Sequence, residues 1–571
     1  MNAVSPVESL VTDHLDLWTA ALKRKSTAGR GSSSKVELYG IKKLRELILE
    51  LAVRGLLVPQ DPSDEPASEL LRKIAAEKAR LVKEGKIKKD KPLPPISNQD
   101  LQIALPNGWS LARLGSFVSI VRGITFPASE KNSEPGPGLV ACLRTANVQA
   151  EIDWEDLLYI DSSFIRRDDQ YLHTGDIVMS MANSRELVGK VSYAGSMPVE
   201  QATFGGFLGV IRPYQLNPSY LMCFLRAPQV RASLIDSASQ TTNIANISLE
   251  KLNPLVVVLP PLAEQHRIVA KVDELMALCD QFEQETEASL GAHQTLVETL
   301  LSALTSAADH TQFASAWQRI AGHFDTLFTT EESIAQLKQT ILQLAVMGKL
   351  VPQDPNDDPA SELLKKIAAR PYKHTLPGWA TVSLGQLGDI LGGATPSKSN
   401  AEYWTGNIPW VSPKDMKRNL ITDAEDHVSE AAISNSSLKK IPPGSLLMVV
   451  RGMILAHSFP VAISECEVTI NQDMKALVIP PELGAYLLTF MQAMKGAFVA
   501  LVDRSSHGTC KLVSEKLWSY PVSLPPLAEQ HRIVAKVDEL MALCDKLKSR
   551  LCDAQTTQLH LADALVEQAI C

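Results

Sequence analysis

The chain has 571 residues, of which 45% are hydrophobic and 21% charged, and its formal net charge is −8. This length predicts about three to four domains, and the composition excludes disordered, collagen-like and mucin-like chains. No apolar run is long enough to span a membrane, the first residues lack a secretory signal pattern, and the eight cysteines form no CxxC pair. We therefore expect a cytoplasmic protein with reduced cysteines.

The first predicted elements are helices. Apolar residues recur at helical spacing from Leu44 to Leu51, and Gly55 follows as a stop signal. A basic run then extends from Lys83 to Lys91; it is more typical of a solvated linker than of a phosphate contact.

The following stretch, to about residue 258, has a different pattern. Short apolar runs bounded by glycine or proline, such as 175–182 and 249–260, predict strands joined by long polar loops. A long helix is then predicted from Pro261 to about Leu300. Its apolar residues have the alternating four-and-three spacing of a heptad seam, which favours helix–helix pairing over an ordinary amphipathic helix. The seam residues are Ile268, Val272, Leu275, Cys279 and Phe282.

The second half of the chain repeats this order. Residues 524–545 are identical to 259–280 over 22 positions, and 341–369 match 48–76 at 23 of 29 positions. The intervening stretches are not recognisably alike, although the run at 444–455 again predicts a strand. A duplicated scaffold with different inserts suits a protein that binds two targets better than one with a single active site.

The repeats predict an α+β protein: two mixed α/β domains separated by long conserved helices, which form an antiparallel coiled coil with a pseudo-two-fold internal repeat. The N-terminal helices would join the C-terminal helix, so the chain ends should lie close together. The predicted segments are an N-terminal helical region 1–104, a first variable domain 105–258, a central helical region 259–375, a second variable domain 376–523 and a C-terminal helix 524–571.

Signatures of catalysis are missing from the sequence. It has no phosphate-binding GxxxxGK[ST] loop, no GxGxxG after a strand, no HExxH and no paired cysteine–histidine spacing. His266 and His531, which lie in the repeated helix, are better explained as interface residues than as catalytic ones. We therefore expect no catalytic residues and no metal site in this chain.

Polar loops of both variable domains carry side chains that can read base edges. In the first domain these candidates are Arg122, Thr125, Arg144, Thr145, Asn147, Asn183, Arg185, Gln240, Thr241, Thr242 and Asn243. In the second domain they are Thr395, Ser397, Lys398, Ser412, Lys414, Lys417, Arg451, Arg504, Ser505, His507 and Thr509. Any one of them could instead be an ordinary solvated loop residue.

The duplicated PPLAEQHRIVAKVDEL blocks and the GGATPSKSNAEYW and NIPWVSPKDM stretches resemble the specificity subunits (HsdS) of type I restriction-modification systems. The N-terminal GIKKLRELILELAVRGLLVPQ resembles the type IB subgroup. The first variable domain departs from the family's GGxTP opening, because it has VRGITFP instead.

The resemblance implies a non-catalytic subunit whose two target-recognition domains each bind half of an asymmetric bipartite site in double-stranded DNA. It implies that the conserved helices set the spacer and dock two methyltransferase (M) subunits, and that two restriction (R) subunits join the complex. S-adenosylmethionine, ATP and Mg²⁺ would be bound by those partners, and no membrane is involved. Two alternatives remain open: a helical interaction scaffold without DNA specificity, and a self-contained enzyme with an unrecognised site.

Overall fold

The computed structural model describes residues 6–24, 36–85, 87, 91–96, 105–240, 244–373, 376–504 and 510–570. The chain divides into two compact units, and each is described by itself. Unit 1 comprises Met1–Ala288 with Gln555–Cys571, and unit 2 comprises Ser289–Ala554. No helix in the described part of the chain is long and apolar enough to cross a membrane.

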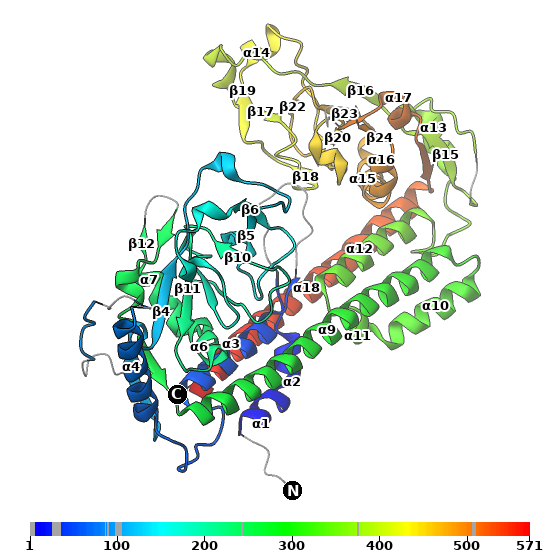
Figure 1. Cartoon of the computed structure of the whole chain (residues 1–571). Helices are drawn as coiled ribbons and strands as arrows, with labels where there is room; N and C mark the ends of the chain where they lie inside the picture. Colours follow the sequence, from blue (N-terminus) through cyan, green and yellow to red (C-terminus); the bar gives the residue numbers. More distant parts are fainter. Residues whose placement is uncertain are drawn as a thin grey trace. The chain divides into compact units, whose positions relative to one another are not determined.

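The helices of unit 1 come from the N-terminal region, from the repeated segments and from the first variable domain (Figure 1). They are α1 (Pro6–Thr12), α2 (Leu15–Ala20), α3 (Tyr39–Arg54), α4 (Ala67–Lys83), α5 (Leu114–Phe117), α6 (Pro218–Arg226), α7 (Pro228–Ser237), α8 (Leu249–Leu252), the first part of α9 (Leu262–Ser306) and the end of α18 (Leu527–Ile570).

The strands of unit 1 form one larger sheet and several small ones. They are β1 (Lys23–Arg24), β2 (Val36–Glu37), β3 (Ser110–Arg113), β4 (Val118–Arg122), β5 (Leu139–Leu143), β6 (Leu158–Asp161), β7 (Ile177–Ser180), β8 (Ala182–Asn183), β9 (Val191–Tyr193), β10 (Ala202–Phe204), β11 (Leu208–Pro213), β12 (Ser239–Gln240), β13 (Ala245–Asn246) and β14 (Val256–Leu259). The larger sheet has the order β4-β11-β7-β9 and is antiparallel throughout.

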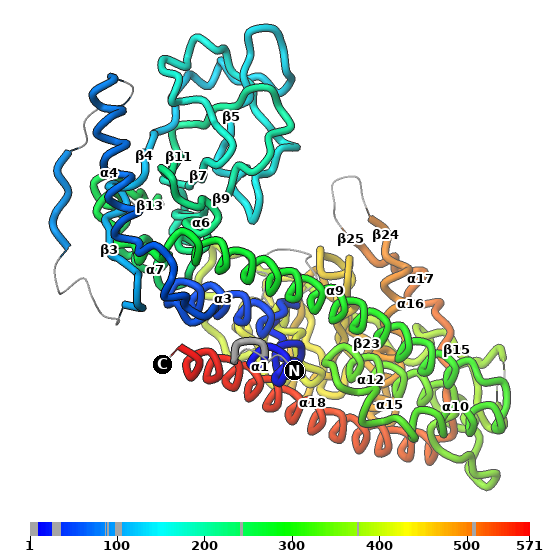
Figure 2. Tube along the Cα trace, turned by 60° about the horizontal axis from the view of Figure 1, so that its bottom comes forward, coloured from blue at the N-terminus to red at the C-terminus, as the bar shows by residue number. Residues whose placement is uncertain are grey.

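Helix α3 lies alongside both α9 and the end of α18 in unit 1 (Figure 2). The Tyr39 hydroxyl donates to Asp563 at 2.8 Å and Arg54 donates to the Ile570 carbonyl at 2.9 Å, so α3 and α18 run in the same direction. Arg45 of α3 pairs with Glu283 of α9, and Asp64, beyond the end of α3, pairs with Arg267 near the start of α9, so α9 runs the opposite way. The predicted joining of the N-terminal helices to the C-terminal helix is confirmed.

The predicted heptad seam on α9 is buried in the core of unit 1. Ile268, Val272, Leu275, Cys279 and Phe282 are all at most 7% exposed. They pack in one cluster with Ile41, Leu44 and Leu47 of α3 and with Ala562 of α18. The spacing therefore marked the face of α9 that contacts other helices, because residues four and three apart share one side of a helix.

The helices of unit 2 repeat this arrangement. They are the remainder of α9, α10 (His310–Gly322), α11 (Phe324–Leu327), α12 (Glu331–Val346), α13 (Ala360–Lys366), α14 (Glu430–Ser434), α15 (Gly484–Ala493), α16 (Lys495–Ala500), α17 (Ser514–Trp518) and most of α18. Lys548 pairs with Glu331 and Lys338 with Asp545, so α12 and α18 are antiparallel, as α3 and α9 are in unit 1.

The strands of unit 2 also follow the pattern of unit 1. They are β15 (Ala380–Ser383), β16 (Asp389–Gly392), β17 (Ile408–Val411), β18 (Leu420–Ile421), β19 (Asp426–Val428), β20 (Leu446–Val449), β21 (Val461–Ser464), β22 (Thr469–Ile470), β23 (Met474–Val478), β24 (Val502–Arg504), β25 (Cys510–Leu512) and β26 (Pro521–Leu524). The larger sheet has the order β16-β23-β20-β21-β18.

The two variable domains thus share one topology although their sequences are not recognisably alike. Strands β4-β11-β7-β9 of unit 1 correspond to β16-β23-β20-β21 of unit 2, and both sets are antiparallel. The small sheet β10-β5-β6 corresponds to β22-β17-β19, with one parallel and one antiparallel pairing in each. This result establishes the predicted mixed α/β class for both domains.

Two predicted strands are shorter than expected. The run 249–260 contains one helical turn, α8, before β14 begins at Val256. The run 444–455 contains β20, but the strand ends at Val449 and a 3-10 turn covers Met453–Ala456. Gly452 lies between them with φ +128°, a conformation that favours glycine and does not continue a strand.

Candidate nucleic-acid interface

The turn between β10 and β11 joins three of the predicted loops of unit 1. The Gly205 amide donates to the Leu143 carbonyl at 2.9 Å, at the end of β5. The Phe207 carbonyl accepts from the amides of Met181 and Ala182, at 2.9 and 3.2 Å, just after β7. Loops that are far apart in the sequence therefore leave the sheets at one place.

The third loop carries Arg122 and Thr125, which are both exposed. The Ile124 amide donates to the Phe204 carbonyl at 2.9 Å, and the Ile124 side chain packs in a small cluster that Phe126 joins. Because Ile124 and Phe126 both pack inward, the side chain of Thr125 between them points to solvent. Gly123 is required here, since a Cβ on it would lie 2.1 Å from the Gly205 carbonyl oxygen.

Asn183, Arg185 and Gln240 are also brought together. Ala245 of β13 pairs with both Asn183 of β8 and Gln240 of β12, so these three positions are neighbours in one small sheet. Arg185 is exposed and pairs with Asp236 at 3.1 Å. Three further candidates, Thr241, Thr242 and Asn243, lie outside the described residues.

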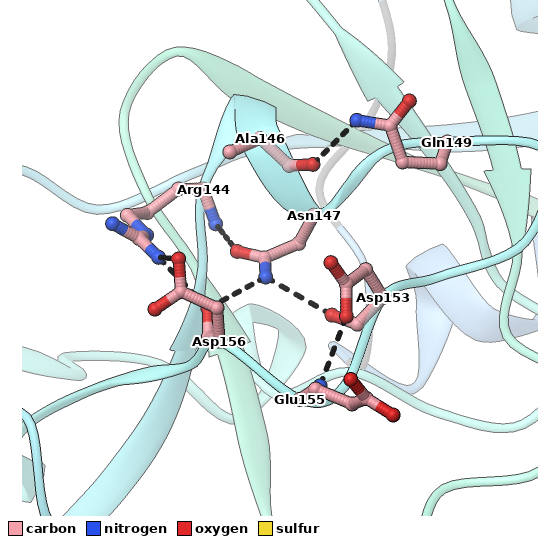
Figure 3. A network of polar contacts seen from close by, with 7 residues as sticks. All are labelled: Arg144, Ala146, Asn147, Gln149, Asp153, Glu155 and Asp156. Atoms are coloured by element: carbon pink, nitrogen blue, oxygen red, sulfur yellow. Dashed lines mark hydrogen bonds and ion pairs between the residues drawn. The ribbon is translucent and has the colours of Figure 1, made fainter. Parts of the chain in front are cut away.

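Asn147, a predicted base contact, is buried and bonded within its own loop in this structure (Figure 3). It is 1% exposed; its Oδ1 accepts from the Arg144 amide at 2.8 Å, and its Nδ2 donates to the carbonyls of Asp153 and Asp156 at 3.0 and 2.8 Å. The Arg144 guanidinium pairs with the Asp156 carboxylate at 2.7 Å. Thr145 is half-buried in the same turn. This network shapes the loop that follows β5.

A corresponding turn joins the loops of unit 2. The Asn471 amide donates to the Val411 carbonyl at 3.0 Å, at the end of β17. The Asp473 carbonyl accepts from the amides of Val450 and Arg451, at 2.8 and 3.1 Å, just after β20. Turn 471–473 therefore has the same role as turn 205–207.

Two tryptophans hold the loop that follows β16. The Trp410 indole donates to the Ala394 carbonyl at 3.0 Å, and the Trp404 indole donates to the Ser397 carbonyl at 3.2 Å. Lys398 and Thr395 of this loop are exposed. The Thr395 hydroxyl donates to the Gln472 side-chain oxygen, so this loop too is bonded to turn 471–473.

The candidate residues after β17 differ in exposure. Ser412, a predicted base contact, is 4% exposed, and its hydroxyl donates to Asp415 at 2.8 Å. Lys414 is exposed and pairs with Asp426 and Glu425 at 3.0 and 3.1 Å; hydrogen bonds to these carboxylates raise the pKa of Lys414. Lys417 is exposed.

Arg451 and Arg504 lie together at the end of unit 2's sheet. Strands β24 and β25 pair through Arg504 and Cys510, and Gly452 donates its amide to the Cys510 carbonyl at 3.0 Å. Both arginines are exposed, and Arg504 donates to the Ala456 carbonyl at 3.1 Å. Ser505, His507 and Thr509 lie outside the described residues.

Sequence reasoning missed the two central turns. Phe207 is 63% exposed, and Gln472 is exposed. The double glycine of Phe204–Phe207 was the available signal, since adjacent glycines indicate a tight turn or a close backbone approach. In 471–473 the available signal was Asn471, since asparagine closes turns by bonding the backbone two residues on; its Oδ1 accepts from the Asp473 amide at 3.0 Å.

Each variable domain is joined to the repeated helix by the same buried contact. The Trp109 indole donates to the Glu264 carboxylate at 3.0 Å, and the Trp379 indole donates to Glu529 at 3.0 Å. Both carboxylates are 1% exposed, and burial raises the pKa of each. His266, by contrast, is exposed and contacts the Asn217 side chain at 3.0 Å. Among the described residues, no group of three or more His, Cys, Asp or Glu side chains could hold a metal ion.

Comparison with known proteins identifies the family to which the chain is similar. The family model described as type I restriction modification DNA specificity domain matches residues 106–291 and 377–553, and these ranges contain both central turns. The type I restriction enzyme EcoAI specificity subunit of Escherichia coli is 38% identical over 99% of this chain and 100% of its own length. The EcoEI specificity subunit of the same species is 35% identical with the same coverage.

Among solved structures, the HsdS subunit from Thermoanaerobacter tengcongensis is 19% identical over 82% of this chain and 98% of its own, with a TM-score of 0.40. The family assignment depends on the sequence matches, which cover nearly the whole chain. These relatives are named as specificity subunits, in agreement with a non-catalytic role. The chain belongs to the family of type I restriction-modification DNA specificity subunits.

Proposed function

We propose that each variable domain of this chain reads one half of an asymmetric, bipartite site in double-stranded DNA. The observation that carries this proposal is the convergence of the candidate loops on one turn in each domain, with different side chains on the same topology. Two domains of one fold with different surface residues would read two different half-sites. Base edges are read by such polar side chains, whereas phosphate contacts only position the protein.

The exposed cations of these loops would contact phosphates or guanines. Arg185 and Lys414 are held by exposed carboxylates at about 3 Å. Such surface pairs contribute little to stability, so a phosphate can replace the carboxylate at small cost. We therefore expect DNA binding to weaken as the salt concentration rises, even though the net charge of the chain is −8.

We also propose that the repeated helices dock two methyltransferase subunits, one on each copy. The exposed face of the repeat is identical in the two copies, although exposed residues are the ones that folding constrains least. Identical exposed faces suit two copies of one partner. In the first copy this face comprises Ala263, His266, Ala270, Asp273 and Ala277.

S-adenosylmethionine, ATP and Mg²⁺ would then be bound by the methyltransferase subunits and by two restriction subunits. This chain would position the DNA, and the partners would supply adenine methylation and ATP-dependent cleavage. The conserved helices would set the length of the nonspecific spacer between the half-sites.

The deciding experiment is methylation profiling of the source strain with and without this gene, by long-read sequencing. Loss of one bipartite N6-methyladenine motif is the expected result. A scaffold without DNA specificity would leave every motif in place, whereas a self-contained enzyme would methylate or cleave DNA as the purified chain with S-adenosylmethionine, ATP and Mg²⁺.

The docking proposal has its own test. Ala270→Trp or Ala535→Trp should each reduce the methyltransferase content of the purified complex from two subunits to one, and the double variant should retain none. Ala314→Trp, an exposed alanine on α10, is the matched control and should retain two. Full binding by the double variant would show that this face is not the docking surface.

A further inference from the structure

The two central turns occupy equivalent positions in their domains. Turn 205–207 connects β10 to β11, and turn 471–473 connects β22 to β23. In each, the last carbonyl accepts two amides from the loop after the neighbouring strand: Phe207 from Met181 and Ala182, and Asp473 from the corresponding residues of unit 2. The backbone of each turn is thus fixed at the point where the candidate loops meet.

Phe207 is an apolar residue surrounded by the polar candidate loops of unit 1. It is 63% exposed, the most exposed of the large hydrophobic residues in the described part of the chain. Its neighbours are the loop of Thr125, whose methyl carbon would lie 2.7 Å from a Cβ on Gly206, and the strand of Asn183. A single exposed apolar residue is common on protein surfaces. Phe207 is distinguished by its place on the fixed turn on which the candidate loops converge.

Gln472 occupies the corresponding turn in unit 2. Its side-chain oxygen accepts a hydrogen bond from the Thr395 hydroxyl, and this bond orients the amide group. The side chain remains exposed. Glutamine is one of the two side chains that pair with the adenine edge in the major groove, and apolar side chains contact the thymine methyl group there.

We propose that these two turns are base-reading elements, with Phe207 contacting a thymine methyl group in one half-site and Gln472 contacting an adenine in the other. This inference rests on the proposed function, because it requires the two domains to read DNA. It adds two specificity-determining residues that lie outside the candidate loops found from sequence.

The first test uses the complete complex, with this chain co-expressed with its methyltransferase subunits, and the methylated motif as readout. Phe207→Ala should relax one position of one half-site and leave the other half unchanged. Trp317→Ala is the matched control, because Trp317 is an exposed aromatic residue (47%) on α10 and should leave the motif intact. Truncation of so exposed a side chain should not unfold the domain.

The second test identifies the contacted group. In duplexes carrying the motif, each thymine is replaced in turn by uracil, which lacks the methyl group. One replacement should weaken binding by the wild-type complex about 4-fold, the value of one buried methyl-sized group, and should have no effect on the Phe207→Ala complex. If every uracil replacement affects both complexes equally, Phe207 does not contact a thymine methyl.

Gln472→Glu tests the hydrogen bond that the Gln472 amide would donate to adenine, because a carboxylate still accepts from Thr395 but cannot donate. It should reduce discrimination at one position of the second half-site by about 5- to 150-fold. If the wild-type chain directs a bipartite motif and these variants direct the same motif, this inference is overturned while the proposed function stands. If the wild-type chain directs no motif, the proposed function itself fails.

Discussion

The buried Asn147 provides a direct test of which loop residues hold the fold and which are available to bind DNA. Replacement by alanine removes one hydrogen bond accepted from the Arg144 amide and two donated to the carbonyls of Asp153 and Asp156. Each such bond contributes about 1 kcal/mol, so we expect a loss of about 2–4 kcal/mol in the local stability of this loop. The loss is limited because Asp153 and Asp156 are exposed and water can replace part of the bonding.

Amide hydrogen exchange measures this local stability. In Asn147→Ala, the amides between β5 and β6 that exchange by local opening should exchange about 30- to 900-fold faster. This factor corresponds to the expected loss of about 2–4 kcal/mol in local stability. Exchange in unit 2 should not change, because the network lies within unit 1. Thr145→Ala is the control, since Thr145 lies in the same turn and takes no part in the hydrogen bonds of the Asn147 side chain.

Two observations together would contradict a purely structural role for Asn147. If Asn147→Ala exchanges at the wild-type rate and its complex methylates an altered motif, Asn147 reads a base and its burial is not maintained in the DNA complex. If exchange accelerates and the motif keeps its bases, the residue supports the loop only.

The remaining predictions concern the buried tryptophan–glutamate contacts and the long helices. Trp109→Phe removes the indole donor to the buried Glu264 carboxylate and should destabilise unit 1 by about 1–3 kcal/mol in denaturant unfolding; an unchanged midpoint would contradict it. Burial raises the pKa of Glu264 above its ordinary value of 4.5, so the folded chain binds this proton more tightly than the unfolded chain does, and stability should fall as pH rises from 4.5 through the raised pKa. Glu264→Gln should remove that part of the pH dependence. Inserting four residues within 283–290 of α9 adds about 6 Å of helix and should lengthen the nonspecific spacer of the methylated motif; an unchanged spacer would count against the helices as a ruler.

The conserved helices were predictable from sequence because the repeat displays the same pattern twice. The heptad residues from Ile268 to Phe282 are buried as expected, and α9 extends from Leu262 to Ser306, slightly beyond the predicted end. Periodicity reports which face of a helix is covered, and this information is local. It does not identify the helix that covers the face, which here is α3 as well as α18.

The fate of single loop residues could not be predicted. Asn147 and Ser412 have the chemistry of base-reading residues, yet both are buried and bonded within the protein. Their partners, such as Asp153 for Asn147, lie three to nine residues away in irregular loops that have no periodicity to read. A polar residue after a strand can equally bind a ligand or close its own loop, and only the three-dimensional contacts distinguish the two.

The shared topology of the two domains was hidden for a related reason. Most of the bonds that gather the loops on each central turn are backbone bonds: carbonyls of Phe207 and Asp473 accept from amides whose side chains take no part. In unit 2, Thr395 and Gln472 add a side-chain bond. Only close approaches such as Gly123 against Gly205 restrict the residue type. Side chains on the turns and loops can therefore change while the loops stay together, which would allow one fold to acquire different specificities. The same freedom removes the sequence similarity by which the two domains could have been matched.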